Sequence, residues 1–119
     1  MVAARMRYWS PVLFFMGYIF YTSCQSGADI PDLFSNQDIV YHFLIYALLG
    51  LSFARALRFE KPSAGLLKII CVCAVFGLLY GFSDEFHQSF VNGRSSQAFD
   101  VAIDTIGSLS GGILIRWLR

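Results

Sequence analysis

The 119-residue sequence contains little charge: only 14% of its residues are Asp, Glu, Lys or Arg, whereas 56% are hydrophobic. A soluble domain usually has about 25% charged residues. The net charge is +1, and no basic stretch is interleaved with aromatic residues, so nucleic acid is not expected as a partner. The shortage of charge excludes an ordinary soluble domain and predicts a single membrane domain over residues 1–119.

Paired cysteines and the common nucleotide and hydrolase motifs are also missing. Cys71 and Cys73 are two residues apart, so they diverge on a helix, and Cys24 is expected near the opposite side of the membrane. Neither a disulfide framework nor a thiolate metal site is predicted. The sequence contains no G-x-S-x-G, Walker loop or glycine-rich dinucleotide turn. We therefore predict no cofactor.

Apolar segments of the sequence predict four helices that cross a bilayer, which takes roughly 20 residues each. The first apolar run, Tyr8 to Ala28, follows Arg5 and Arg7, and a cleaved signal peptide is its competing interpretation. The poor cleavage site near Cys24 favours a retained helix. The predicted fold class is all-α, a four-helix transmembrane bundle with helices at about 8–24, 38–57, 63–88 and 96–118.

Capping residues and prolines predict where these helices begin. Pro11 is expected near the start of the first helix, where its missing N–H is harmless. Ser35 is expected to cap the second helix, with Asp38 three residues further on. Pro62 is expected in the first turn of the third helix.

Basic residues are distributed very unevenly between the two predicted sides of the membrane. Eight of the nine Lys and Arg residues fall at the N-terminus, in the 55–68 region or at the C-terminus. The other side has Arg94 as its one basic residue, together with seven of the eight acids. Because Lys and Arg in short loops stay on the cytoplasmic side, both termini are predicted to be cytoplasmic and the polar residues to face outward.

Acids and glycines share one face on each of the last two predicted helices. These faces consist of Gly77, Gly81, Glu85 and Gln88, and of Asp100, Asp104, Gly107 and Gly111. Glycines four residues apart allow two helix backbones to approach closely in lipid. We therefore predict that the two faces pack on each other and that their acids surround one pocket.

His42 is the predicted acid–base residue, because an imidazole can be tuned to titrate near neutrality. Asp38 lies one turn before it and Tyr46 one turn after, so Asp38 is within reach to orient the ring. Glu85 and Gln88 are expected opposite. A hydrogen-bonded core histidine is the plainer alternative. His42 could also coordinate a metal together with Glu85 and an aspartate. The sequence contains no H-x-x-x-H or H-x-x-E pairing, however, and we predict no stoichiometric metal.

Several of these segments resemble the VanZ-like family. The stretch Asp38–Tyr46 is similar to the family's D-x-x-x-H-F-x-x-Y signature, and Asp84–Gln88 is similar to its D-E-x-x-Q. Gly93-Arg94 and the spaced series Asp100, Asp104, Gly107 and Gly111 follow in similar order. The resemblance implies a small bacterial integral membrane protein of the multi-pass type, located in the cytoplasmic membrane and related to a teicoplanin-resistance accessory protein. It implies no particular reaction.

The predicted site is an outward-facing polar pocket that engages a cell-envelope molecule. Its candidate catalytic residues are His42, Glu85 and Asp38. Its ligand-binding candidates are Arg94, Gln88, Asp100, Asp104 and Tyr46. Arg94 would bind a phosphate or carboxylate through two parallel N–H groups.

The expected partner of this pocket is a membrane lipid or a lipid-linked wall precursor, with a role related to glycopeptide resistance. Enzymatic and purely binding versions of this function both stay open, as does the oligomeric state. One alternative is a non-catalytic membrane accessory protein whose polar residues only anchor helix ends. Another is an ion- or proton-conducting unit, which is disfavoured because no acid or base lies deep in the predicted cytoplasmic half.

Overall fold

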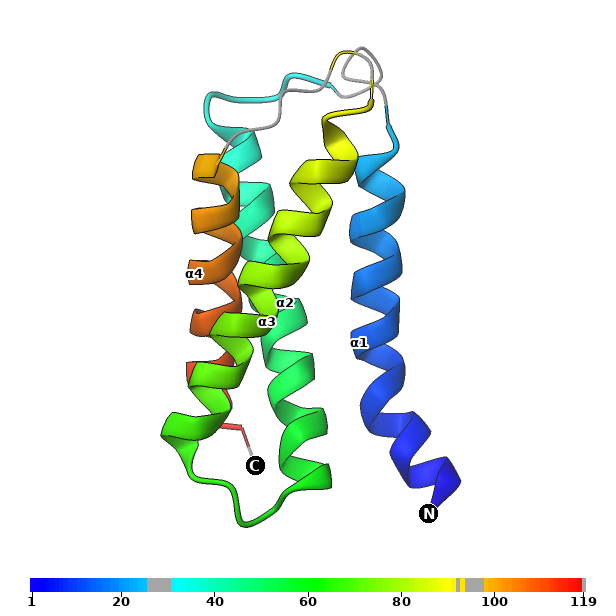
Figure 1. Cartoon of the computed structure of the whole chain (residues 1–119), viewed down its shortest axis with the longest axis vertical. Coiled ribbons are helices and arrows are strands. Elements are labelled where there is room, and N and C mark those ends of the chain that lie inside the picture. The colour runs from blue at the N-terminus through cyan, green and yellow to red at the C-terminus, as the bar shows by residue number, and fades with distance from the viewer. Residues whose placement is uncertain (26–30, 92, 94–97, 119) are drawn as a thin grey trace.

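The computed structural model describes residues 1–25, 31–91, 93 and 98–118, and these residues form four helices and no strand (Figure 1). The helices are α1 (Val2–Ser23), α2 (Gln37–Glu60), α3 (Leu66–Gln88) and α4 (Ala98–Leu114). The predicted all-α class is thus confirmed. Two of the helices, α2 and α3, are long and apolar enough to cross a membrane, judged by length and composition.

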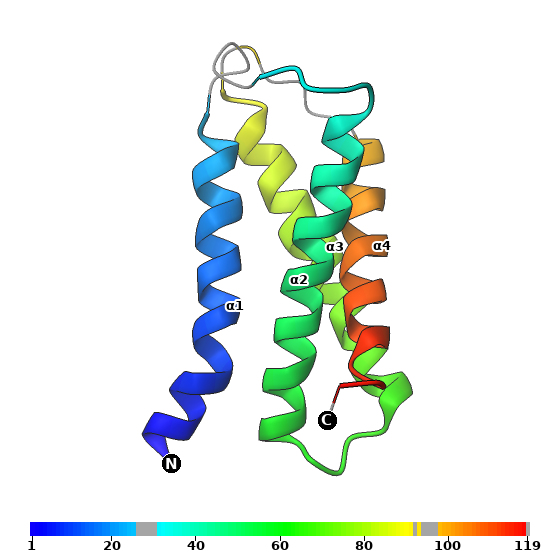
Figure 2. The ribbon, with the colours of Figure 1, turned by 180° about the vertical axis from the view of Figure 1, so that it is seen from behind.

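Successive helices run in opposite directions, so both termini lie at the same end of the bundle (Figures 1 and 2). Helix α4 packs against both α2 and α3, and α1 packs on the outside against the same two helices. The longest dimension of the chain is 45 Å. This length is similar to the roughly 40–45 Å thickness of a bilayer with its head groups.

Glycines allow α4 to approach its neighbours, but not in the arrangement that the sequence predicted. A Cβ added at Gly77 would collide with the side chain of Ser108, so the α3 glycine face does meet α4. Gly107 and Gly111 on α4, in contrast, face α2: a Cβ at Gly107 would lie 2.6 Å from the carbonyl oxygen of Phe43, and one at Gly111 would collide with that of Ala47. The predicted pairing of the two glycine faces is therefore wrong, because α4 uses different faces for α2 and α3.

Three predicted helix starts also need correction. Helix α1 begins at Val2, so Pro11 lies inside it, where a missing N–H favours a bend. Helix α2 is preceded by Asn36 in the left-handed conformation, without a side-chain capping bond, rather than by a Ser35 cap. Pro62 lies in a turn closed by the Ala64 N–H on the Lys61 carbonyl, 3.0 Å away, and α3 begins only at Leu66.

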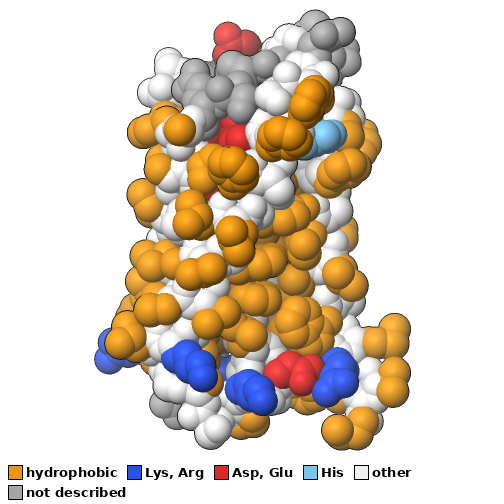
Figure 3. All heavy atoms as spheres, viewed as in Figure 1, with side chains coloured by type: hydrophobic (Ala, Val, Ile, Leu, Met, Phe, Trp, Pro, Cys, Tyr) orange, Lys and Arg blue, Asp and Glu red, His pale blue; other side chains and the backbone are white. Residues whose placement is uncertain are grey.

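Side chains are sorted by type along the length of the bundle. Figure 3 shows a broad hydrophobic belt around the middle and Lys and Arg side chains at the end where the termini lie. At that end Arg5 pairs with Glu60 at 2.8 Å, and Trp9 donates a hydrogen bond of 3.0 Å to the same carboxylate. The predicted division between a basic end and an acidic end is therefore present in the fold.

Candidate functional site

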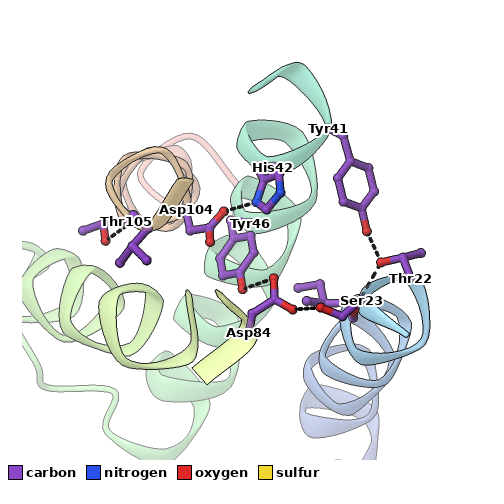
Figure 4. A network of polar contacts seen from close by, with 10 residues as sticks. Thr22, Ser23, Tyr41, His42, Tyr46, Asp84, Asp104 and Thr105 are labelled. Carbon is purple, nitrogen blue, oxygen red and sulfur yellow. Dashed lines mark hydrogen bonds and ion pairs between the residues drawn. The ribbon is translucent and has the colours of Figure 1, made fainter. Parts of the chain in front are cut away.

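A buried histidine–aspartate pair joins α2 and α4 at the end of the bundle opposite the termini (Figure 4). Nδ1 of His42 lies 2.6 Å from Oδ1 of Asp104, and the two residues are 1% and 0% exposed. Asp104, rather than Asp38, is therefore the carboxylate that orients the imidazole. A buried imidazole held by a carboxylate can accept and release a proton, which is the requirement for acid–base chemistry.

A second carboxylate, Asp84, connects three helices in the same region. Its Oδ1 accepts a hydrogen bond from the hydroxyl of Ser23, the last residue of α1. Its Oδ2 accepts a longer bond, 3.4 Å, from the hydroxyl of Tyr46 on α2. Tyr46 is fully buried and stacks against His42 with a ring separation of 6.4 Å. The carboxylates of Asp84 and Asp104 therefore belong to one polar network, which also contains Ser23, His42 and Tyr46 (Figure 4).

Further polar side chains are buried beside these two pairs. Glu85 and Gln88 on α3 and Asp100 on α4 are 4%, 3% and 8% exposed. Ligand atoms of His42, Asp84, Glu85 and Asp104 all lie within 4.8 Å of one another. We call these four residues the carboxylate–histidine cluster. Burying so many ionisable groups together is costly unless they share protons, hydrogen bonds or a bound ion.

An apolar pocket of about 510 Å³ opens between α1, the connection that follows it and α2. Its lining residues are Tyr18, Thr22, Gln25, Pro31, Leu33, Phe34, Gln37, Asp38, Val40 and Tyr41. The hydroxyls of Thr22 and Tyr41 lie 2.5 Å apart, which ties the two helices together at the pocket wall. Thr22 precedes Ser23 in the chain and Tyr41 precedes His42, and both Ser23 and His42 are buried polar residues. The pocket and the polar network are thus built on adjacent positions of the same two helices.

The structure brings together most of the residues predicted for the site. Six of them are buried at this end of the bundle: His42, Tyr46, Glu85, Gln88, Asp100 and Asp104. Asp38 is exposed and lines the apolar pocket. Arg94 lies outside the described residues.

Sequence reasoning missed two residues of the polar network, Ser23 and Asp84. Asp84 occurs in the D-E-x-x-Q segment, but only Glu85 and Gln88 share the helical face that carries Gly77 and Gly81, so helical spacing does not point to Asp84. The family-like motif was the signal that could have identified it. Ser23 had no comparable signal, because its role depends on how α1 packs against α3.

Comparison with known proteins gives one family and one curated relative. A family model described as VanZ/LLP1 matches residues 8–119. The chain is also 37% identical over 71 residues to the uncharacterized protein C11E3.10 of Schizosaccharomyces pombe. That match covers 60% of this chain and 41% of the yeast protein, so the chain spans about two fifths of this relative. No solved structure matches the chain.

Proposed function

The chain belongs to the VanZ/LLP1 family, which confirms the resemblance found in its sequence, and on that premise we propose that it binds an amphipathic membrane lipid. In this proposal the protein crosses the membrane four times. The apolar part of the lipid lies in the pocket between α1 and α2, and its polar head group reaches the buried polar network beside it.

A membrane location is supported by the outer surface of the bundle. Large apolar side chains are more than half exposed on several helices, including Leu13, Phe14, Leu79 and Phe82. In water such a continuous surface would be unfavourable or would mark an interface. In a bilayer the same side chains contact acyl chains. The apolar character of α2 and α3 supports the same location.

The proposed orientation follows from the separation of charge. The termini and the connection between α2 and α3 lie at one end and carry Arg5, Arg58 and Lys61, among other basic residues. Such residues favour the cytoplasmic side of a membrane. The carboxylate–histidine cluster and the apolar pocket would then lie toward the extracytoplasmic leaflet.

The observation that carries the proposal is the adjacency of the apolar pocket and the buried polar network. Thr22 and Tyr41 line the pocket, while their chain neighbours Ser23 and His42 bind the buried carboxylates of Asp84 and Asp104. An amphipathic molecule has the matching division into an apolar and a polar part. A free polar solute would gain nothing from the apolar lining, and an alkane would gain nothing from the polar network.

A phosphate-bearing head group is the chemistry we favour, and it could belong to a phospholipid or to a lipid-linked wall precursor. Arg94 is the residue proposed to bind that phosphate. His42, held by Asp104, would supply proton transfer if the ligand reacts, with Glu85 as a second acid or base.

A structural role for the polar network is the alternative, and one observation supports it. Asp84 connects Ser23 on α1 with Tyr46 on α2, so it could serve mainly to hold α1 on the bundle. The chain would then act as a non-catalytic membrane accessory protein, and the pocket would be a by-product of helix packing.

Filling the apolar pocket separates these two functions. Val40 lines the pocket on α2, so Val40→Trp should exclude a lipid chain without touching the carboxylate–histidine cluster. We expect wild-type protein in mild detergent to co-purify with one lipid class enriched over the bulk membrane, as measured by mass spectrometry. Val40→Trp should lose that enrichment.

The matched control is Leu44→Trp, one turn further along α2, at an exposed position that does not line this pocket. Leu44→Trp should retain the enriched lipid. Equal lipid composition in wild type and both variants would contradict lipid binding in the pocket and would favour the structural role.

A further inference from the structure

We propose that the carboxylate–histidine cluster binds a divalent transition-metal ion, with Mn²⁺ as the best-suited probe. His42, Asp84, Glu85 and Asp104 each offer one ligand atom, and these atoms lie within 4.8 Å of one another. The four residues come from α2, α3 and α4 and are all buried. The inference deepens the proposed function, because it concerns the polar network that would meet the lipid head group, but metal binding can be tested separately.

The spacing of the ligand atoms fits a single ion. Two ligands on opposite sides of such an ion are separated by about 4.2 Å, which is twice a metal–ligand distance of about 2.1 Å. The largest separation in the cluster is only slightly greater. Small side-chain rotations would therefore bring all four atoms into one coordination shell, with the helix backbones unchanged.

One oxygen in the cluster is left available for an ion. Within the described part of the chain, Oδ2 of Asp104 is buried and has no hydrogen-bond partner. A Cβ at Gly81 would lie 2.9 Å from this oxygen, so Oδ2 faces α3, one turn before Asp84 and Glu85. A buried carboxylate oxygen without a partner is unfavourable, and a cation would satisfy it. Oδ1 meanwhile pairs with Nδ1 of His42, which leaves Nε2 as the ring nitrogen that could meet the ion.

The donor set indicates which ions fit. Three carboxylates and one imidazole combine hard oxygen ligands with a nitrogen ligand. Mg²⁺ and Ca²⁺ prefer oxygen ligands alone, and structural zinc sites prefer sulfur and several nitrogens. Mn²⁺ prefers carboxylates and is also bound by glutamate together with histidine in helical-bundle metal sites. The sequence predicted no metal because it lacks a local pairing of histidine ligands and offers few nitrogen or sulfur ligands for zinc. These four ligands meet only because three helices pack together.

A bound cation would also resolve a conflict within the proposed function. Three carboxylates repel an anionic head group. A divalent ion would cancel two of these three negative charges and would offer a phosphate oxygen a metal centre to bind. Lipid binding would then depend on metal, whereas metal binding would not depend on lipid.

The test uses the full-length protein in detergent. The protein is stripped with EDTA, desalted, loaded with MnCl₂ and desalted again, and bound Mn²⁺ is measured by elemental analysis and by electron paramagnetic resonance. We expect about one Mn²⁺ per chain in the wild type. Glu85→Gln and Asp104→Asn should each bind Mn²⁺ at least about tenfold more weakly, since even residues that only orient ligands affect affinity by that factor.

Asp32→Asn is the matched control, because it removes an exposed carboxylate at the same end of the bundle without altering the cluster. It should bind Mn²⁺ as the wild type does. Circular dichroism and gel filtration in detergent identify variants that are not folded. If a cluster variant does not fold, the deciding measurement is instead made on the wild-type protein. Mn²⁺ should raise its thermal midpoint, and EDTA should lower that midpoint again.

Two results would overturn the metal site: no Mn²⁺ above the detergent blank together with an unchanged thermal midpoint, or folded Glu85→Gln that binds as tightly as wild type. Lipid enrichment that persists in metal-free protein would refute the dependence of lipid binding on metal. Mn²⁺ binding without any lipid enrichment would leave the metal site intact and refute the proposed lipid ligand instead.

Discussion

The missing side chain of Gly81 on α3 makes room for the carboxylate of Asp104 on α4. A Cβ at position 81 would lie 2.9 Å from both Cβ and Oδ2 of Asp104, closer than real Cβ atoms approach such neighbours. Asp104 is fully buried and is held from the other side by His42. A glycine is therefore required at position 81 for the histidine–aspartate pair to occupy its place between the helices.

Substitution of this glycine should damage both stability and the site. We expect Gly81→Ala to lower the free energy of unfolding by about 1–3 kcal/mol, the usual cost of forcing an extra carbon into a packed interior. Gly17→Ala is the control, because nothing lies within 4 Å of a Cβ at that exposed α1 position. Gly17→Ala should instead raise the free energy of unfolding by about 0.5–1 kcal/mol, because alanine favours a helix more than glycine does. Thermal unfolding in detergent measures both changes, and equal behaviour of the two variants would contradict the packing of Gly81 on Asp104.

The hydrogen bond between Ser23 and Asp84 should couple α1 to α3 energetically. We expect a double-mutant cycle of Ser23→Ala and Asp84→Asn to give an interaction energy of about 0.5–3 kcal/mol, as residues in direct contact do. The measurement is the thermal stability of the wild type, the two single variants and the double variant. Additive effects would mean that this hydrogen bond does not help to hold α1, which would then depend on its other polar contacts and on apolar residues such as Val12 and Ile19.

The sequence was sufficient to predict the helices because each one carries its own signals. The apolar runs indicated four helices, and the charge distribution indicated a basic and an acidic end. Helix periodicity placed Glu85 and Gln88 on one face, and Asp100 and Asp104 on another. All four are buried in the structure. Helix positions, charged ends and helix faces depend only on residues close together in the chain, so a single sequence is enough to predict them.

The partners of individual side chains could not be predicted in the same way. Asp38 lies one turn from His42 and was the nearest acid in sequence, yet Asp104, which is 62 residues away, contacts the imidazole. Gly107 was expected against α3, yet it packs on α2. Both outcomes depend on how α4 is rotated between two neighbours, and helical spacing alone does not fix that rotation.

Reporter fusions test the proposed orientation in the membrane. Fusions after Arg58 and at the C-terminus should report the cytoplasm, because the basic residues gather at that end. Fusions near Asp32 and in the connection between α3 and α4 should report the outside. A phosphatase that is active only outside and a fluorescent protein that folds only inside provide the two readouts. The reverse pattern would place the pocket and the polar network in the cytoplasmic leaflet and would refute every envelope-facing part of the proposal.

The functional prediction concerns antibiotics that act at the outer surface of the membrane. A glycopeptide with a lipid tail enters the same leaflet as the proposed lipid ligand, whereas one without a tail stays in water. We therefore expect expression of the wild-type chain in a susceptible Gram-positive bacterium to shift sensitivity to the lipid-anchored drug more than to the other. The minimum inhibitory concentrations of both drugs are the measurement.

The controls for this experiment are Glu85→Gln and Arg94→Ala, compared at matched protein levels in the membrane. Glu85 is a buried member of the carboxylate–histidine cluster, and Arg94 is the proposed phosphate ligand, so both variants should lose the difference between the two drugs. Because Glu85→Gln preserves the shape of the side chain, its failure would reflect the lost charge rather than lost packing. If both variants shift sensitivity as much as wild type does, the polar network is not responsible for the effect. The accessory role, in which buried polar residues only hold the helices together, would then be the better account.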